Sequence, residues 1–190
     1  ECLSSLAACD YPDLEVIMCD DGSTDRTLEI ANGFDFRILP LDHGGLSNAR
    51  NAGIRAATGD IVAFLDADAA CHEHWPWYLA LSIEDEGVVA TGGPNLPVPG
   101  AGLVERAVAL SPGAPLEVLI GDDRAEHVPG CNMAFEREAI LGIGGFNPLY
   151  TSAGDDVDVC WKLLDAGGEI GFSPAAQIYH HRRATVIGYL

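Results

Sequence analysis

The chain has 190 residues, 48% of them hydrophobic, and a formal net charge of −19 at pH 7. This length and hydrophobic content predict one domain, residues 1–190, with a sizeable buried core. The charge excludes nucleic acid as a partner, because phosphate contacts depend on clustered Lys and Arg and the chain contains ten such residues in all. The six cysteines lack a CxxC spacing, which favours buried thiols over disulfides or zinc ligands and indicates a reducing, cytoplasmic location.

Short apolar runs alternate with helix-like segments along the first half of the chain. The runs are typical of strands buried on both faces and cover residues 15–19, 36–39, 61–65 and 88–91. The helix-like segments cover residues 23–32, 46–57 and 73–85. This alternation predicts an α/β fold with a mostly parallel sheet flanked by helices.

Both ends of the chain indicate a piece of a longer protein. Residues 1–9 have the spacing of a helix face, so a first strand is expected to precede them and is missing from this chain. The last residues, "ATVIGYL", carry no stop signal. No run approaches the roughly 18 apolar residues of a membrane span, and no signal peptide is visible. The parent protein could still be associated with a membrane, with this domain at its cytoplasmic face.

Beyond Gly92 the pattern becomes less regular. The stretch "GGPNLPVPGAG" (92–102) is rich in Pro and Gly, and it predicts a surface loop with a functional role. A strand is expected at 131–135. A helix is expected from about Asp155 to Ala166, because acids in its first turn complement the helix dipole and glycines follow its end.

The stretch "CDDGSTD" (19–25) places two acids at the end of a predicted strand. Gly22 provides a tight turn, and Ser23 or Thr24 would cap the following helix. Asp20 and Asp21 are not needed for that cap, and acids at such a position can bind a ribose or base. A phosphatase of the haloacid dehalogenase class is a rival, but its nucleophilic Asp is replaced here by Cys19.

Two further stretches point to a phosphate-bearing ligand and its cation. "HGGLSNARNAG" (43–53) places two glycines before a helix and Arg50 on its second turn, where amides and a guanidinium can meet a diphosphate or a base. In "IVAFLDADAA", Asp66 and Asp68 are two residues apart, so on an extended strand both would face one ligand. Mg²⁺ and Mn²⁺ prefer such carboxylate oxygens. An ordinary loop or an acidic turn is the alternative for each stretch.

The last two stretches lie near the end of the chain. "AGDDVDVCW" places Asp155 and Asp156 at a helix start, where they are either simple caps or groups that reach a cleft. "PAAQIYHHRR" ends a strand-like run with His180 and His181, which are either structural or metal ligands.

With these clusters in this order, the chain resembles the family 2 glycosyltransferases of the GT-A fold. The resemblance covers nearly all 190 residues and rests on "YPDLEVIMCDDGSTDRT", "GLSNARNAGIRAATGDIVAFLDADA", "GGPN", "PGCNMAFERE", "GGFNP" and "AGDDVDVCWKL". It implies metal-dependent transfer of a sugar, with inversion, from a nucleotide-diphosphate donor to a hydroxyl acceptor. The donor is expected to be a UDP-sugar, the cofactor Mn²⁺ or Mg²⁺, and the acceptor a glycan or lipid-linked group in bacterial envelope or exopolysaccharide synthesis.

The resemblance also implies that the first half of the chain, residues 1–92, binds the nucleotide. Asp20 and Asp21 include the acid that contacts the base or ribose, with Arg50 nearby. Asp66 and Asp68 match the DxD pair of the family, in which the second acid binds the metal and the first lies nearer the ribose and the water shell of the metal.

The second half, 93–190, is expected to be the acceptor-binding and catalytic half. Asp156 matches the catalytic base of the ED motif in this family, while Asp155 stands where Glu is common, which leaves open which of the two acts. A late His six residues after a Pro completes the metal site in related enzymes; Pro174 and His180 have that spacing, so His180 is preferred over His181. A sugar nucleotidyltransferase, or a non-catalytic nucleotide-binding module of the same fold, remain alternatives.

Overall fold

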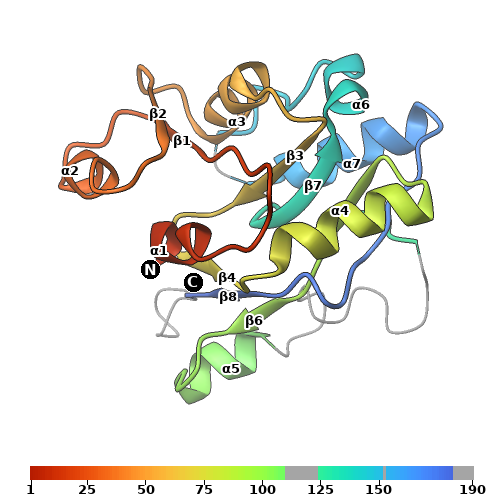
Figure 1. The fold of residues 1–190 in the computed structure, drawn as a ribbon. Helices are drawn as coiled ribbons and strands as arrows, with labels where there is room; N and C mark the ends of the chain where they lie inside the picture. The colour runs from red at the N-terminus through yellow and green to blue at the C-terminus, as the bar shows by residue number, and fades with distance from the viewer. Residues whose placement is uncertain (110–123, 152, 182–190) are drawn as a thin grey trace.

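The computed structural model describes residues 1–109, 124–151 and 153–181. Helices flank a layer of short strands, so the predicted α/β class is confirmed (Figure 1). The helices are α1 (Cys2–Ala7), α2 (Thr27–Ala31), α3 (Leu46–Ala56), α4 (Trp75–Glu86), α5 (Leu103–Ala109), α6 (Arg137–Gly142) and α7 (Asp155–Asp165). Among the described residues, no helix is both long enough and apolar enough to cross a membrane.

The strands form three hydrogen-bonded groups. β1 (Ile17–Asp20) runs parallel to β2 (Arg37–Pro40). β7 (Asn132–Glu136) lies between β3 (Ile61–Leu65) and β5 (Ala90–Gly92) and is antiparallel to both. The strand directions are therefore more mixed than the predicted mostly parallel sheet, because β7 enters the sheet late and in the opposite direction.

The third group carries residues of the candidate site. β8 (Ile178–His180) pairs with β4 (Ala69–Cys71) in antiparallel fashion and with β6 (Asn95–Pro97) in parallel fashion. The predicted surface loop 92–102 therefore contains a strand, β6. It is ordered there because its backbone pairs with β8, a contact between distant parts of the chain that the Pro and Gly content does not reveal.

β7 is the central strand of the core. Met133 and Phe135 point into an apolar cluster with α6 and α7, whereas Ala134 points into a second cluster with α4. This alternation follows from the two-residue period of a strand. Helices therefore cover both faces of β7, which fixes its amino end, the neighbour of the candidate site, between two packed layers.

The predicted helix 23–32 is shorter in the structure and begins at Thr27. The Ser23 amide donates to the Asp20 carboxylate at 3.3 Å, and the Thr27 amide donates to Asp25 at 2.9 Å. These side-chain bonds keep residues 23–26 out of the helix, so neither Ser23 nor Thr24 caps it. Helices α3 and α7, by contrast, lie where the sequence predicts them.

The "GGPN" stretch is explained by close backbone packing. A Cβ added to Gly92 would lie 2.6 Å from the Asn132 carbonyl oxygen. A Cβ added to Gly93 would lie 2.0 Å from the Ala176 carbonyl oxygen. Both neighbours are backbone atoms, so a larger residue at Gly92 would push β5 away from β7, and one at Gly93 would displace the segment that leads into β8.

We expect Gly93→Ala to lower the free energy of unfolding by about 1–3 kcal/mol or more, because an over-packed site forces the backbone to shift. Gly142→Ala is the matched control, since an added Cβ there meets nothing within 4 Å. Thermal denaturation of both variants checks this expectation. Equal midpoints for the two variants would contradict the packing argument.

Candidate active site

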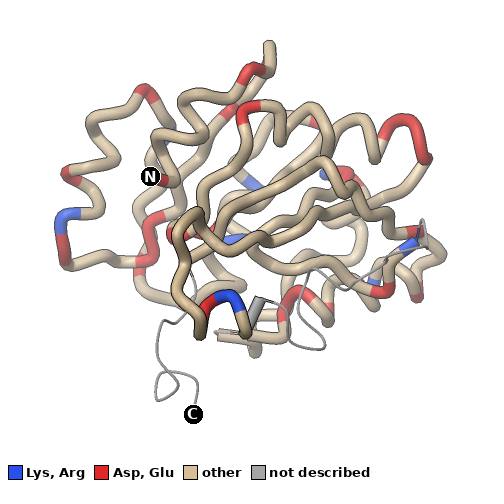
Figure 2. The backbone as a smooth tube through the Cα atoms, turned by 90° about the horizontal axis from the view of Figure 1, so that it is seen from below, with Lys and Arg blue, Asp and Glu red and all other residues tan. Residues whose placement is uncertain are grey.

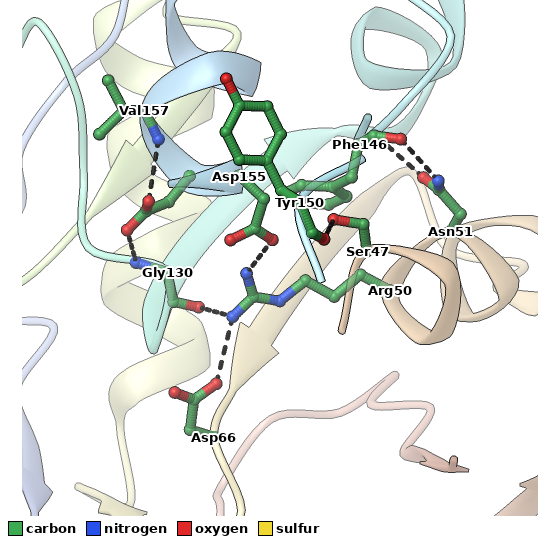
Figure 3. Close-up of polar contacts among 10 residues, drawn as sticks. Ser47, Arg50, Asn51, Asp66, Gly130, Phe146, Tyr150, Asp155 and Val157 are labelled. Carbon is green, nitrogen blue, oxygen red and sulfur yellow. Dashed lines mark hydrogen bonds and ion pairs between the residues drawn. The ribbon is translucent and has the colours of Figure 1, made fainter. Parts of the chain in front are cut away.

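Acidic residues are spread along the described backbone, and basic ones are few (Figure 2). Two of these acids nevertheless contact one buried arginine, Arg50. Arg50 on α3 is 7% exposed, and it contacts Asp66, which follows β3, and Asp155 at the start of α7 (Figure 3). Its guanidinium also donates to the Gly130 carbonyl oxygen at 2.8 Å. Arg50 thus connects three segments that are distant in sequence.

Aromatic rings complete the surroundings of Arg50. The guanidinium carbon lies 5.9 Å from the centre of the Phe64 ring and 5.5 Å from that of Phe146. Asn51, the next residue, fixes Phe146 by accepting from its amide at 2.8 Å and donating to its carbonyl oxygen at 2.7 Å. Arg50 is therefore held by charge, by hydrogen bonds and by cation–π contacts.

The Asp66-Ala67-Asp68 segment is not the extended strand that the two-residue spacing of its acids predicts. β3 ends at Leu65, and the Ala69 amide donates back to the Asp66 carbonyl oxygen at 3.0 Å, which makes the segment a turn. Asp66 points toward Arg50 at 3.2 Å, and Asp68 contacts His180 at 3.0 Å. The turn therefore gives the two carboxylates different partners.

The environment of Asp66 suits a positive ligand. Burial raises the pKa of Asp66 above its ordinary value, Arg50 opposes this effect, and the Asp68 carboxylate adds to it. A cation bound beside Asp66 would stabilise its charged form and reverse the rise.

The contact between Asp68 and His180 fits the geometry of a hard metal ion. Two neighbouring ligands of an octahedral ion at about 2.1 Å lie roughly 3 Å apart. The Asp68 Oδ1 and His180 Nε2 atoms are separated by 3.0 Å. His181 instead contacts Glu1 at 2.8 Å. His180 thus lies beside Asp68, whereas His181 does not, and the choice of His180 as a metal ligand stays a prediction.

Asp155 and Asp156 have different environments although they are adjacent. Asp155 is 2% exposed, and its carboxylate pairs with Arg50. Asp156 is half-buried, and its carboxylate accepts from the amides of Gly130 and Val157, both at 3.0 Å. Asp155 is thus committed to an internal ion pair, whereas Asp156 is held by the backbone at the edge of the site.

Asp20 and Asp21 also differ. The Asp21 carboxylate accepts from the amides of Gly44 and Gly45 at 2.8 and 2.9 Å, which joins the end of β1 to the loop before α3. The Gly44 amide is the main cause that lowers the pKa of Asp21. Asp20 is 4% exposed, and among the described residues its Oδ1 atom has no hydrogen-bond partner. Asp20 therefore has one buried carboxylate oxygen that no group in the described part of the chain uses.

Cys131 is a site residue that the sequence reasoning missed. Its sulfur, a carboxylate oxygen of Asp66 and a ring nitrogen of His180 all lie within 4.8 Å of one another. The signal was in principle present: pairing the predicted strands 61–65 and 131–135 as an antiparallel ladder brings their ends, and so Asp66 and Cys131, together.

The predicted residues lie in three places. Arg50 contacts Asp66 and Asp155, and Asp156 lies beside this group because it accepts from the Gly130 amide. Asp68 contacts His180, and Asp20 and Asp21 lie at the end of β1.

Solved structures identify the fold. S. aureus TarS, residues 1–349 in complex with UDP-GlcNAc, aligns with a TM-score of 0.76 at 21% identity, covering 97% of this chain and 54% of that one. GalNAc-T7 with UDP, GalNAc and Mn²⁺ aligns with a TM-score of 0.70 at 20% identity, covering 89% of this chain and 38% of that one. The fold is therefore the GT-A fold of glycosyltransferases, as predicted.

Sequence comparison then gives the family. The profile described as "Glycosyl transferase family 2" matches residues 1–142, and the chain belongs to this family. The pre-mycofactocin glycosyltransferase of Mycobacterium tuberculosis is 32% identical over 180 residues, which cover 90% of this chain and 38% of the relative. The poly-beta-1,6-N-acetyl-D-glucosamine synthase of Staphylococcus epidermidis is 29% identical over 187 residues, 92% of this chain and 44% of the relative. The chain thus spans less than half the length of these relatives.

Proposed function

We propose that this chain is the catalytic domain of a metal-dependent, inverting glycosyltransferase that moves a sugar from a nucleotide-diphosphate donor to a hydroxyl acceptor. The observation that carries the proposal is the Arg50 group, which brings the Asp66 turn and the first turn of α7 to one place. Family membership supports the reaction class.

Residues 1–92 form the donor half in this proposal. The buried, unpaired Oδ1 atom of Asp20 is the proposed acceptor for the base or ribose, and Asp21 holds the loop beside it. Arg50 has a positioning role in place of the predicted nucleotide contact, because its guanidinium is buried and bonded to protein groups. The donor is a UDP-sugar, a choice supported by the structures of TarS with UDP-GlcNAc and GalNAc-T7 with UDP.

Asp68 and His180 are the proposed ligands of Mn²⁺ or Mg²⁺, with Asp66 beside them. Their 3.0 Å separation fits two ligands of one ion. When bound there, the ion offsets the negative charge that develops on the departing diphosphate.

Residues 93–190 form the acceptor half. Asp156 accepts the proton of the acceptor hydroxyl as that oxygen attacks the anomeric carbon from the face opposite the diphosphate. The Gly130 and Val157 amides fix the Asp156 carboxylate during this step. A single displacement of this kind inverts the anomeric centre and involves no covalent enzyme intermediate.

The acceptor is a glycan or a lipid-linked group, and the domain works at the cytoplasmic face of a membrane. The relative from S. epidermidis, which is a poly-beta-1,6-N-acetyl-D-glucosamine synthase, supports a role in polysaccharide synthesis.

A thermal-shift experiment tests the donor and metal proposal. UDP with Mn²⁺ at about 100 times the dissociation constant is expected to stabilise the chain by about 2.7 kcal/mol. For a chain of this size, that corresponds to a rise in melting temperature of roughly 5–11 °C. GDP, dTDP and CDP should give smaller shifts. Asp68→Ala should lose the part of the UDP-induced shift that depends on Mn²⁺.

Asp165→Ala, at the exposed far end of α7, is the control and should respond as the unchanged chain does. Equal shifts with and without Mn²⁺ would contradict the metal dependence. Release of pyrophosphate from a nucleoside triphosphate and a sugar phosphate would favour a nucleotidyltransferase instead. Nucleotide binding with no turnover of any nucleotide-sugar would favour a non-catalytic module.

A further inference from the structure

We propose that Asp66, Cys131 and His180 form a second cation site, which uses a cysteine thiolate and selects a borderline-soft ion such as Zn²⁺ or Co²⁺. The site itself stands on the geometry of these three residues. Its effect on donor binding rests on the function proposed above, because His180 and Asp66 would be shared between the two sites.

Strand pairing brings the first two ligands together. β3 and β7 are antiparallel, and Leu65 is paired with Asn132. Asp66 follows Leu65, and Cys131 precedes Asn132. Because the strands are antiparallel, both residues lie at the same end of the ladder, on neighbouring strands. β8 supplies the third ligand, since His180 pairs with Ala69 shortly after the Asp66 turn.

The spacing of the three donor atoms is close to that of a zinc site. A tetrahedral Zn²⁺ with one sulfur at about 2.3 Å and nitrogen or oxygen at about 2.0–2.1 Å holds its ligand atoms roughly 3.3–3.6 Å apart. The sulfur, oxygen and nitrogen here lie within 4.8 Å of one another, so rotations of side chains complete the approach. Cys131 is 8% exposed, while the Asp66 side chain is 38% exposed and gives the ion a route of entry.

The hydrogen bonds of His180 leave a nitrogen for this ion. His180 Nε2 contacts Asp68 Oδ1 at 3.0 Å. The Nδ1 atom is buried and has no hydrogen-bond partner among the described residues. A carboxylate that accepts from one ring nitrogen keeps the lone pair on the other, and this is the usual arrangement around a metal-binding histidine. We therefore assign Nδ1 to the thiolate site.

The same histidine makes the two cation sites mutually exclusive. A neutral imidazole has one lone pair, so His180 binds an ion through Nε2 beside Asp68 or through Nδ1 beside Cys131, but not through both. The ligand sets also prefer different ions. A thiolate suits Zn²⁺ or Co²⁺, whereas Asp68 and donor phosphates suit Mg²⁺ or Mn²⁺.

Cys131 is already oriented as an electron-pair donor. The Asn95 side-chain amide donates to its sulfur at 2.9 Å. On binding, the sulfur–metal bond forms as the thiol proton passes to solvent, so ion uptake releases one proton from Cys131. The absence of a CxxC spacing favours buried thiols over zinc ligands, and this site is an exception built from a Cys, an Asp and a His on three separate segments.

Titration with Co²⁺ tests the site through its absorbance, independently of activity. The unchanged chain should show a thiolate-to-cobalt charge-transfer band in the near ultraviolet. Cys131→Ser should lose the band and bind Co²⁺ at least about tenfold more weakly. Cys71→Ser is the matched control and should keep the band, because Cys71 is also 8% exposed and its sulfur lies 3.6 Å from that of Cys9.

A band that persists in Cys131→Ser, or no band in the unchanged chain, would overturn the proposal. With UDP and Mn²⁺ present, Zn²⁺ should reduce the thermal shift of the unchanged chain and leave that of Cys131→Ser intact. A cobalt band without any thermal shift with UDP would support the thiolate site and contradict the proposed function. A thermal shift with UDP without a cobalt band would support the proposed function and contradict the thiolate site.

Discussion

Asp156→Asn is expected to reduce turnover about 10²–10⁴-fold while leaving donor binding intact, because a positioned general base contributes that factor to a proton transfer. The Gly130 and Val157 amides donate to different oxygens of Asp156, both at 3.0 Å, and the Asn side chain keeps one acceptor oxygen for one of them. The loss of the other hydrogen bond should cost about 1 kcal/mol of stability, so the fold should be preserved. UDP release from UDP-GlcNAc measures turnover, and the thermal shift with UDP and Mn²⁺ measures binding.

Asp158→Asn is the matched control for this variant. Asp158 lies in the same first turn of α7 but pairs with Lys162 at 2.7 Å, so its loss should change turnover little. Asp155→Asn should destabilise the fold instead, since it weakens the pair with Arg50. Full activity in Asp156→Asn would contradict its assignment as the base.

Arg50→Met is expected to lower the free energy of unfolding by about 3–5 kcal/mol, because it leaves the Asp155 carboxylate buried without its charged partner. Asp155 is 2% exposed, so water cannot replace the lost contact. For a chain of this size the melting temperature should fall by roughly 6–20 °C. Chemical or thermal denaturation provides the measurement.

Two further variants distinguish the loss of the ion pair from a general effect of replacing an arginine in helix α3. Arg55→Met removes an exposed arginine from the same helix and should have little effect. Arg50→Met combined with Asp155→Leu should recover most of the lost stability, because an apolar pair of similar volume often replaces a buried ion pair without loss. If the double variant lost as much free energy of unfolding as the two single variants together, Arg50 and Asp155 would not be energetically coupled, which would contradict the ion-pair account.

Local patterns predicted much of the frame of the site. Helices α3 and α7 lie where their periodicity and end signals place them. The acids Asp20 and Asp66 lie at or just after the ends of β1 and β3, where short apolar runs between turn residues place them. These two strands are not buried on both faces as predicted, since only one residue of each is buried.

The missed features depend on partners that are distant in sequence. Arg50 is predicted to lie near the nucleotide. In the structure it is buried, and it forms an ion pair with Asp155, which is 105 positions away in the sequence. Cys131 joins Asp66 only through the register of β3 with β7, and neither residue reveals that register by itself. The start of α2 was misplaced for a more local reason, since side chains of Asp20 and Asp25 bond to the backbone in place of the expected cap.

Calorimetric titration of Mn²⁺ with and without UDP tests most directly whether Asp68 and His180 hold a metal together with the donor diphosphate. The protein offers few oxygen ligands there, and a hard ion takes its remaining ligands from phosphates. We predict weak binding of Mn²⁺ alone and at least tenfold tighter binding with UDP, about 1.4 kcal/mol. Equal affinities with and without UDP would contradict the account of a donor site completed by the nucleotide.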